Sequence, residues 1–228
     1  MSTRALNVTA AQRSFEWQAD ADPPAASGMP PRNLLPRDGE VHDHGRLYAE
    51  DEATALLTQL CEAVPFRPDE LVIAGKRVVT SRLVAWYGDD GAKYGYSGAT
   101  KVALPFTPTL RAVKERVERA AGCTFNACLL NLYPTGQEGM SWHSDDEPAL
   151  GRSPIIASLS LGAARRFDFR HKRDREKVSV TLEHGQLLVM RGVTQHHWQH
   201  ALPKTAKVHS VRVNLTFRTI LLGRPERP

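Results

Sequence analysis

Residues 51–64 repeat their apolar positions with the period of an α-helix. Leu56, Leu57, Leu60 and Val64 fall on one face of such a helix, among polar and small residues. This spacing predicts an amphipathic helix, because apolar residues three and four apart line a single stripe. We expect that stripe to pack against another element of the fold.

A second helix is predicted to begin after Thr107 and Pro108. Threonine is a good N-cap because its hydroxyl accepts a hydrogen bond from the first turn, and proline suits the first helical position. The apolar residues that follow at helical spacing are Leu110, Val113 and Val117. We expect the helix to end at Gly122, because glycine readily adopts the left-handed conformation found after helices.

From residue 125 onward the pattern changes to short runs that are typical of β-strands. The expected strands are 125–133, 155–161, 166–171, 177–183, 186–191 and 209–220. His184 and Gly185 separate two of these runs and predict a tight turn. Two helices followed by many short strands predict a mainly β protein of the α+β class, a β-sandwich or jelly roll supported by helices on one side.

The run 209–220 alternates between polar and apolar residues. Residues two apart in a strand project to the same side, so one face would carry charged and polar groups. These are Arg212, Asn214, Thr216 and Arg218, while Val211, Val213, Leu215 and Phe217 form an apolar outer face. If the polar face points into the fold, its guanidinium groups need an anion there, because buried charges must be paired. The alternative is an exposed, solvated edge strand.

His143 and Asp145 lie two residues apart, and a further histidine, His200, follows. Two histidines and one carboxylate suit non-haem Fe(II) with open coordination positions. In an extended segment His143 and Asp145 would project to the same side and grip one ion. By itself a His-x-Asp pair is more often a hydrogen-bonded pair on the surface.

The composition sets the class of protein. The chain has 228 residues, 30 Lys and Arg against 25 Asp and Glu, and a sequence pI of about 9.3. This balance is compatible with a polyanionic partner without establishing one. The unpaired cysteines Cys61, Cys123 and Cys128 fit a reducing cytosol, so we expect a cytoplasmic protein.

The domain organisation is expected to be simple. Residues 1–31 are rich in proline and alanine and are predicted to form a flexible tail. Residues 32–221 are predicted to form one domain and residues 222–228 a C-terminal tail. No apolar stretch is long enough to span a membrane, and the N-terminus lacks a signal-peptide pattern.

Several motifs carry a family resemblance: residues 131–133, 142–147, 158–162, 169–172, 198–203 and 212–218. Together they resemble the AlkB family of Fe(II)- and 2-oxoglutarate-dependent dioxygenases, which demethylate nucleic acid bases. The resemblance covers residues 32–221 and implies a double-stranded β-helix with two or more supporting helices. It also implies demethylation of N1-methyladenine and N3-methylcytosine in DNA, with RNA as a further candidate substrate, and release of formaldehyde, succinate and CO2.

The resemblance also implies roles for individual residues. His143, Asp145 and His200 would be the catalytic iron ligands beside the O2 position, with His197 as the runner-up for the second histidine. The co-substrate 2-oxoglutarate would be bound by Asn131, Tyr133, Arg212, Asn214 and Arg218. Arg212 would pair with the distal carboxylate, and Arg218 would lie near the carboxylate that chelates iron.

The base pocket is expected from two further segments. Tyr94, Tyr96 and Ser97 match the family's lid, and Tyr96 would stack on the flipped base. The carboxylates of Asp146 and Glu147 would favour positively charged methylated bases. Without the iron motif, these segments would be interpreted as a plain hairpin and a solvated loop. Candidates for phosphate contacts are Arg165, Arg166, Arg170, Lys172, Arg173, Lys204 and Lys207.

One departure from the family concerns the strand preference. Relatives that act on duplex DNA carry an aromatic wedge before the lid, whereas residues 71–75 here contain no aromatic residue. We therefore expect single-stranded substrate to be favoured, and a monomer. The alternatives are a dioxygenase of the same fold that acts on a protein or small molecule, and a non-enzymatic nucleic-acid-binding module with a structural metal.

Overall fold

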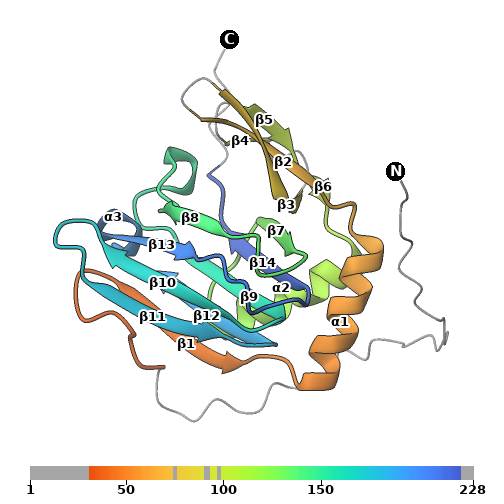
Figure 1. Cartoon of the computed structure of the whole chain (residues 1–228), viewed down its shortest axis with the longest axis horizontal. Coiled ribbons are helices and arrows are strands. Elements are labelled where there is room, and N and C mark those ends of the chain that lie inside the picture. Colours follow the sequence, from red (N-terminus) through yellow and green to blue (C-terminus); the bar gives the residue numbers. More distant parts are fainter. Residues whose placement is uncertain (1–30, 74–75, 90–92, 97–98, 222–228) are drawn as a thin grey trace.

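The chain is seen in a computed structural model that describes residues 31–73, 76–89, 93–96 and 99–221 (Figure 1). For residues 71–73, 76–78, 93–96 and 99–102 only the backbone is described. The predicted tails, 1–31 and 222–228, lie outside the described residues except for residue 31. No helix in the described residues is long and apolar enough to cross a membrane.

Two sheets, antiparallel except for the parallel pairing of β6 with β3, form the body of the protein (Figure 1). The larger sheet has the spatial order β1 (Glu40–Arg46), β12 (Gln186–Arg191), β9 (Ile156–Gly162), β14 (Arg212–Arg218), β7 (Ala127–Tyr133), β3 (Lys76–Gly88) and β2 (Arg67–Ile73), with β6 (Leu104–Pro105) beside β3. The smaller sheet has the order β11 (Lys177–Leu182), β10 (Arg165–His171), β13 (Trp198–Leu202) and β8 (Met140–His143). A separate hairpin pairs β4 (Lys93–Tyr96) with β5 (Ala99–Val102).

The helices are α1 (Glu50–Ala63), α2 (Pro108–Ala121), the short α3 (Thr194–His197) and the 3-10 turn η1 (Pro148–Leu150). The two long helices match their predicted positions. At the start of α2, the Thr107 hydroxyl accepts a hydrogen bond from the Leu110 amide at 3.2 Å. After its end, Gly122 adopts a left-handed conformation with φ of 65°. The capping residues therefore define both ends of this helix, as predicted.

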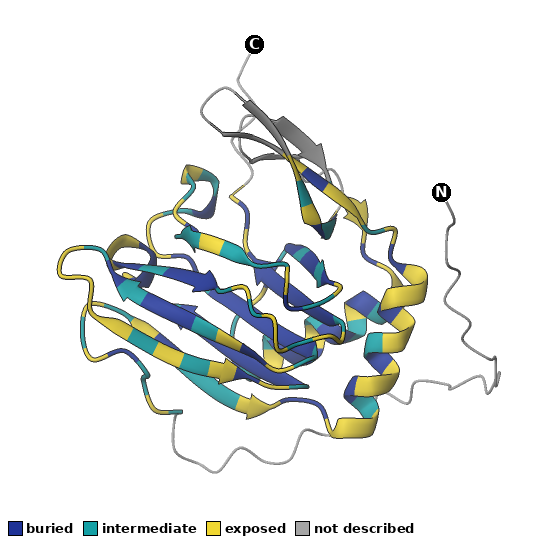
Figure 2. Ribbon diagram, viewed as in Figure 1, coloured by how far each residue is buried: buried dark blue, intermediate teal, exposed yellow. Residues whose placement is uncertain are grey.

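The larger sheet and the two long helices share one hydrophobic core. α1 buries Ala53, Leu56 and Leu60, and both helices contact β9. In Figure 2 the buried residues of α1 face the sheet, and its outer surface is exposed. Burying such side chains contributes roughly 2 kcal/mol each relative to leaving them in water. The helices therefore cover one face of the larger sheet and leave its other face to the smaller sheet.

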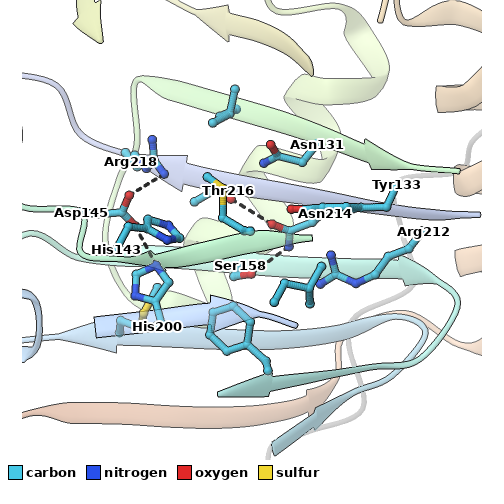
Figure 3. Close-up of a pocket in the computed structure, with 15 residues that line it drawn as sticks. Asn131, Tyr133, His143, Asp145, Ser158, His200, Arg212, Asn214, Thr216 and Arg218 are labelled. Carbon is cyan, nitrogen blue, oxygen red and sulfur yellow. Dashed lines mark hydrogen bonds and ion pairs between the residues drawn. The ribbon is translucent and has the colours of Figure 1, made fainter. Parts of the chain in front are cut away.

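β14 lies in the middle of the larger sheet, and all of its residues are buried. The alternation predicted for this strand is present, but the apolar face is not an outer surface. Val213, Leu215 and Phe217 belong to the core beneath the helices. The polar face points into the space between the two sheets (Figure 3). The predicted strand 209–220 is longer than observed, because only 212–218 pairs with β7 and only 212–217 pairs with β9.

The fold is the mainly β, helix-supported arrangement that the sequence predicts. The strands predicted after residue 125 are all present, within a few residues of their expected ends. The sequence pattern missed β1, β2, β3, β6, β8 and β13. β8 and β13 carry the two histidines of the predicted metal site, and Asp145 follows β8 in a loop. β8 is short and only partly buried, so it has no clear apolar period.

Candidate active site

The structure brings His143, Asp145 and His200 together. His143 ends β8 and lies directly opposite His200 of β13 in the smaller sheet. One donor atom from each of the three residues lies within 4.8 Å of the others. His200 Nε2 and Asp145 Oδ2 are 3.7 Å apart. This distance is longer than a hydrogen bond and leaves room for an ion between the atoms.

Neighbouring groups hold the donors in position. The His143 Nδ1 lies 2.8 Å from the Ser141 carbonyl oxygen. Because a carbonyl only accepts, we assign the proton to Nδ1, which leaves Nε2 free to bind a metal. Arg218 donates to Asp145 Oδ1 at 2.7 Å. The Asp145 amide donates to Gln195 Oε1 at 2.9 Å.

The protonation states also suit metal binding. Burial, with a smaller contribution from His143, lowers the pKa of His200 to about 3. Burial alone would raise the pKa of Asp145, but Arg218 and the two histidines together lower it. A neutral imidazole and an ionised carboxylate are the forms that bind metal ions. The donor set therefore fits Fe(II), the ion that two histidines and a carboxylate favour when other positions stay open.

Arg212 is a buried cation without a counter-charge from the described residues around it. Its side chain is 2% exposed, and its Nη2 donates to the Ser160 hydroxyl at 2.9 Å. Its Nε makes no hydrogen bond. Its guanidinium carbon lies 5.5 Å from the Tyr133 ring centre. Burial lowers the pKa of Arg212 to about 10. A buried guanidinium with an unused hydrogen-bond donor is suited to bind a carboxylate, because a carboxylate can accept two hydrogen bonds from it.

The other predicted co-substrate residues lie beside Arg212 on neighbouring strands. Tyr133 is directly opposite Arg212, and Asn131 is directly opposite Asn214. The Asn131 Oδ1 is buried and makes no hydrogen bond. By contrast, the Asn214 amide is engaged by Ser158, Leu159 and Thr216. Asn214 would therefore bind a co-substrate only by exchanging one of these partners.

One cavity between the two sheets connects these groups. In Figure 3 the residues His143, Asp145 and His200 gather at one end, and Arg212 and Tyr133 lie at the other. The cavity is thus a slot with a metal-binding end and a cationic end. An elongated dicarboxylate matches this arrangement, because one carboxylate would meet the metal and the other would meet the guanidinium.

The predicted base-pocket residues are less closely associated with the cavity. Asp146 is exposed and its Oδ2 pairs with Lys172 Nζ at 3.3 Å. Glu147 is half-buried, and its Oε2 makes no hydrogen bond. Neither is among the described residues that line the cavity. The side chains of Tyr94, Tyr96 and Ser97, predicted to form the lid, lie outside the described residues.

Two further histidines and one arginine that the sequence singled out lie outside the cavity. His197, the runner-up ligand, lies outside the cavity and belongs to a different cluster. His184 accepts a hydrogen bond from the Gly162 amide, which makes it a structural residue. Arg165 was proposed for phosphate contact, and that hypothesis is wrong. Arg165 is 2% exposed and donates to backbone carbonyls, so no phosphate can reach it.

Several residues in or beside the site were given no role from the sequence. Ser158 lines the cavity and accepts a hydrogen bond from Asn214, and Ser160 accepts one from Arg212. Their spacing of two along a buried strand was a usable signal, because it matches the period of the polar face of β14. Gln195 orients Asp145, and Phe167 stacks on His200 with ring centres 5.4 Å apart. No pattern in the sequence marks these last two.

Known proteins resemble this chain in sequence and fold. The profile of the 2OG-Fe(II) oxygenase superfamily matches residues 42–218. The alpha-ketoglutarate-dependent dioxygenase alkB homolog 3 of Homo sapiens is 45% identical over 179 residues, which are 74% of this chain and 62% of that protein. The DNA oxidative demethylase ALKBH2 of Mus musculus is 37% identical over 224 residues, which are 90% of this chain and 94% of that protein.

A solved structure shows the same fold at low sequence identity. OsALKBH1 superposes with a TM-score of 0.54 and 18% identity, covering 81% of this chain and 99% of the other. This chain spans about three fifths of the alkB homolog 3 relatives, but nearly all of the mouse ALKBH2 protein. The donor cluster and the buried arginine fit the metal and the co-substrate that the superfamily name states. The chain therefore belongs to the 2OG-Fe(II) oxygenase superfamily and, within it, to the AlkB family.

Proposed function

We propose that this protein catalyses oxidative demethylation of N-alkylated bases in DNA, with N1-methyladenine and N3-methylcytosine as substrates. One observation carries the proposal: a single cavity holds an open His-Asp-His donor set at one end and an uncompensated buried guanidinium at the other. A structural metal site is closed by a fourth protein ligand. Such a site binds no co-substrate, so it would have no use for a guanidinium that can bind a carboxylate.

The residues of the cavity have distinct tasks in this reaction. His143, Asp145 and His200 hold the iron, and Arg218 fixes the Asp145 carboxylate through its 2.7 Å hydrogen bond. Arg212 binds the distal carboxylate of 2-oxoglutarate and sets its direction along the slot. With iron, 2-oxoglutarate and O2 bound, the site would oxidise the N-methyl group of the base. The products would be formaldehyde, succinate and CO2.

The outer face of the smaller sheet supports a nucleic-acid substrate. A groove there is lined by Trp142, Arg166, Lys177 and Lys204, next to the strand that ends in His143, and also by Asp168, which pairs with Arg166 at 3.0 Å. The Arg170 guanidinium lies 4.1 Å from the Trp142 ring centre, stacked over its face. Basic and aromatic side chains in one groove suit a polyanion with unstacked bases. The proposed phosphate contacts are Arg166, Arg170, Lys172, Arg173, Lys204 and Lys207.

Single-stranded DNA is the proposed preferred form, and RNA is a second substrate class. Residues 71–75 offer no aromatic side chain to fill the gap that a flipped base leaves in a duplex. We further propose a monomer that works in the cytoplasm. The free cysteines Cys61, Cys123 and Cys128 support a reducing compartment.

The test is turnover of a methylated oligonucleotide by the Fe(II)-loaded protein. We expect formaldehyde and succinate in equal amounts from a single strand containing N1-methyladenine or N3-methylcytosine, and neither product from His143→Ala. Succinate without formaldehyde would show that the base is not the substrate and that a protein or small molecule takes its place. A matched duplex oligonucleotide tests the strand preference, which is wrong if the duplex turns over faster.

A further inference from the structure

A second cluster of histidine and carboxylate side chains lies outside the cavity. Donor atoms of Asp38, His171 and His197 all lie within 4.8 Å of one another. Asp38 precedes β1, His171 ends β10, and His197 ends α3. Three segments that are distant in sequence therefore meet at this point, and none of the three residues lines the active-site cavity.

His171 is the buried centre of this cluster. Its side chain is 2% exposed, and its ring packs against Trp198 with ring centres 5.0 Å apart. The Nε2 lies 3.3 Å from Asp38 Oδ2, and the Nδ1 lies 3.1 Å from Asp174 Oδ1. Neither nitrogen makes a hydrogen bond of acceptable geometry. A buried imidazole without hydrogen bonds is costly, so the cluster calls for a further partner.

Asp174 is placed as an orienting group for His171. Histidines that bind metal ions almost always point their other ring nitrogen at a carboxylate or carbonyl. Here Nδ1 faces Asp174, while Nε2 faces Asp38. Arg37 bonds both Asp174 and Glu176, which fixes the Asp174 carboxylate. The arrangement of donor and orienting group is thus present around His171.

The distances and charges also fit a divalent ion. Zinc bonds of about 2.0–2.1 Å in a tetrahedral site place neighbouring ligand atoms about 3.4 Å apart. The 3.3 Å between Asp38 Oδ2 and His171 Nε2 matches that separation. Asp38, Asp174 and Glu176 carry three negative charges around one cation, Arg37, which leaves the cluster anionic when the histidines are neutral.

We propose that Asp38, His171 and His197 form a second metal site that binds Zn²⁺, with solvent as the remaining ligand. Two imidazoles and a carboxylate are a ligand set that zinc accepts. The ion would tie the segment before β1 to α3. In the same helix, Gln195 accepts the hydrogen bond from the Asp145 amide, so this site also supports the position of an iron ligand.

The test is a titration of the metal-free full chain with Co²⁺, a spectroscopic probe for zinc sites. We expect two ions per chain in the wild type, and one ion per chain in His197→Ala and in Asp38→Asn. Both substitutions affect exposed side chains, and neither residue lines the cavity. The matched variant His143→Ala weakens the iron site instead, and it should keep one ion with the strong visible absorption of four-coordinate Co²⁺.

The proposal is overturned if the wild type binds one ion and His143→Ala binds none. It is also overturned if His197→Ala and Asp38→Asn still bind two. A second readout is thermal unfolding of His143→Ala, in which Zn²⁺ should raise Tm because an ion that binds only the folded state stabilises it. Adding His197→Ala to this variant should abolish the increase. These outcomes do not depend on demethylase activity, so they test the second site separately from the proposed function.

Discussion

Arg165 and Arg212 are two buried arginines with opposite surroundings. Each is 2% exposed, and each begins a strand, Arg165 in β10 and Arg212 in β14. The Arg165 guanidinium donates to the backbone carbonyls of Thr135, Glu138 and Pro203 at 3.1, 2.9 and 2.8 Å. The Arg212 guanidinium donates to one hydroxyl, that of Ser160.

The difference separates a structural charge from a ligand-binding one. The carbonyl oxygens around Arg165 accept from both of its terminal nitrogens and leave only Nε without a partner, and in return the guanidinium fixes the loops that carry them. Arg212 keeps donors unused at the end of a cavity, and burial lowers its pKa to about 10. Burial alone is therefore a poor guide to function. The two arginines differ in how many hydrogen bonds the fold supplies, and the one with fewer, at the end of a cavity, is the one we assign to a ligand.

The largest expected effect is on the use of 2-oxoglutarate by Arg212→Met. Removing one partner of a buried, hydrogen-bonded charge pair costs roughly 2–5 kcal/mol. We therefore expect kcat/KM for 2-oxoglutarate to fall about 10²–10³-fold. Succinate formation at varied 2-oxoglutarate measures this, with urea unfolding to check the fold. A fall of less than about fivefold would mean that Arg212 is as structural as Arg165.

Arg165→Met should lower the stability of the folded protein, in contrast to the effect of Arg212→Met on the use of 2-oxoglutarate. The carbonyls that accept from Arg165 would lose a shared donor, and buried acceptors without partners cost roughly 1–3 kcal/mol each. We expect the free energy of unfolding to fall by about 3 kcal/mol. Urea denaturation of the wild type, Arg165→Met and Arg212→Met gives the comparison. Equal stability of the two variants would remove the distinction between the arginines.

Ligand binding should stabilise the protein only where Arg212 is intact. A ligand at a hundred times its Kd stabilises the folded state by about 2.7 kcal/mol. We expect 2-oxoglutarate with Mn²⁺ to raise the Tm of the wild type, and the same concentrations to leave Arg212→Met unchanged apart from the effect of Mn²⁺ alone. A similar increase in both proteins would place the co-substrate away from Arg212.

Ser160→Ala should have the smallest effect. The Ser160 hydroxyl is the protein hydrogen-bond partner of Arg212, and such a hydrogen bond contributes about 1 kcal/mol. We expect the affinity for 2-oxoglutarate to change by roughly fivefold at most. Ser179→Ala is the matched control, because the Ser179 hydroxyl bonds Asp168 outside the cavity. An effect as large as that of Arg212→Met would contradict the assignment of the main role to the arginine.

The polar face of β14 was predictable because a strand repeats every second residue. The strand has polar residues at every second position and apolar residues between them, so a buried strand must have one polar and one apolar face. The polar residues are Arg212, Asn214, Thr216 and Arg218. α2 was predictable because its caps are local. The polar face of β14 and the ends of α2 could both be predicted because each depends on residues that are neighbours in sequence.

The rest depended on contacts between distant segments. β8 and β13 are short, and each is specified by pairing with neighbouring strands rather than by its own pattern. His143 and His200 become neighbours only through that pairing, so a motif and a resemblance located them where periodicity could not. Arg165 and Arg212 look alike in the sequence. What distinguishes them is a set of backbone carbonyls that accept hydrogen bonds from Arg165. These belong to residues 135–138 and 203, whose position is set by the tertiary fold.

The central claim is that Arg212 recognises the distal carboxylate of 2-oxoglutarate. The most direct test is calorimetric titration of the Mn²⁺-loaded wild type and Arg212→Met with 2-oxoglutarate and with 2-oxopentanoate, which has a methyl group in place of that carboxylate. We predict that the wild type binds 2-oxoglutarate about 10²-fold or more tightly than 2-oxopentanoate, and that Arg212→Met binds both alike. Equal preference for 2-oxoglutarate in the two proteins would contradict the claim.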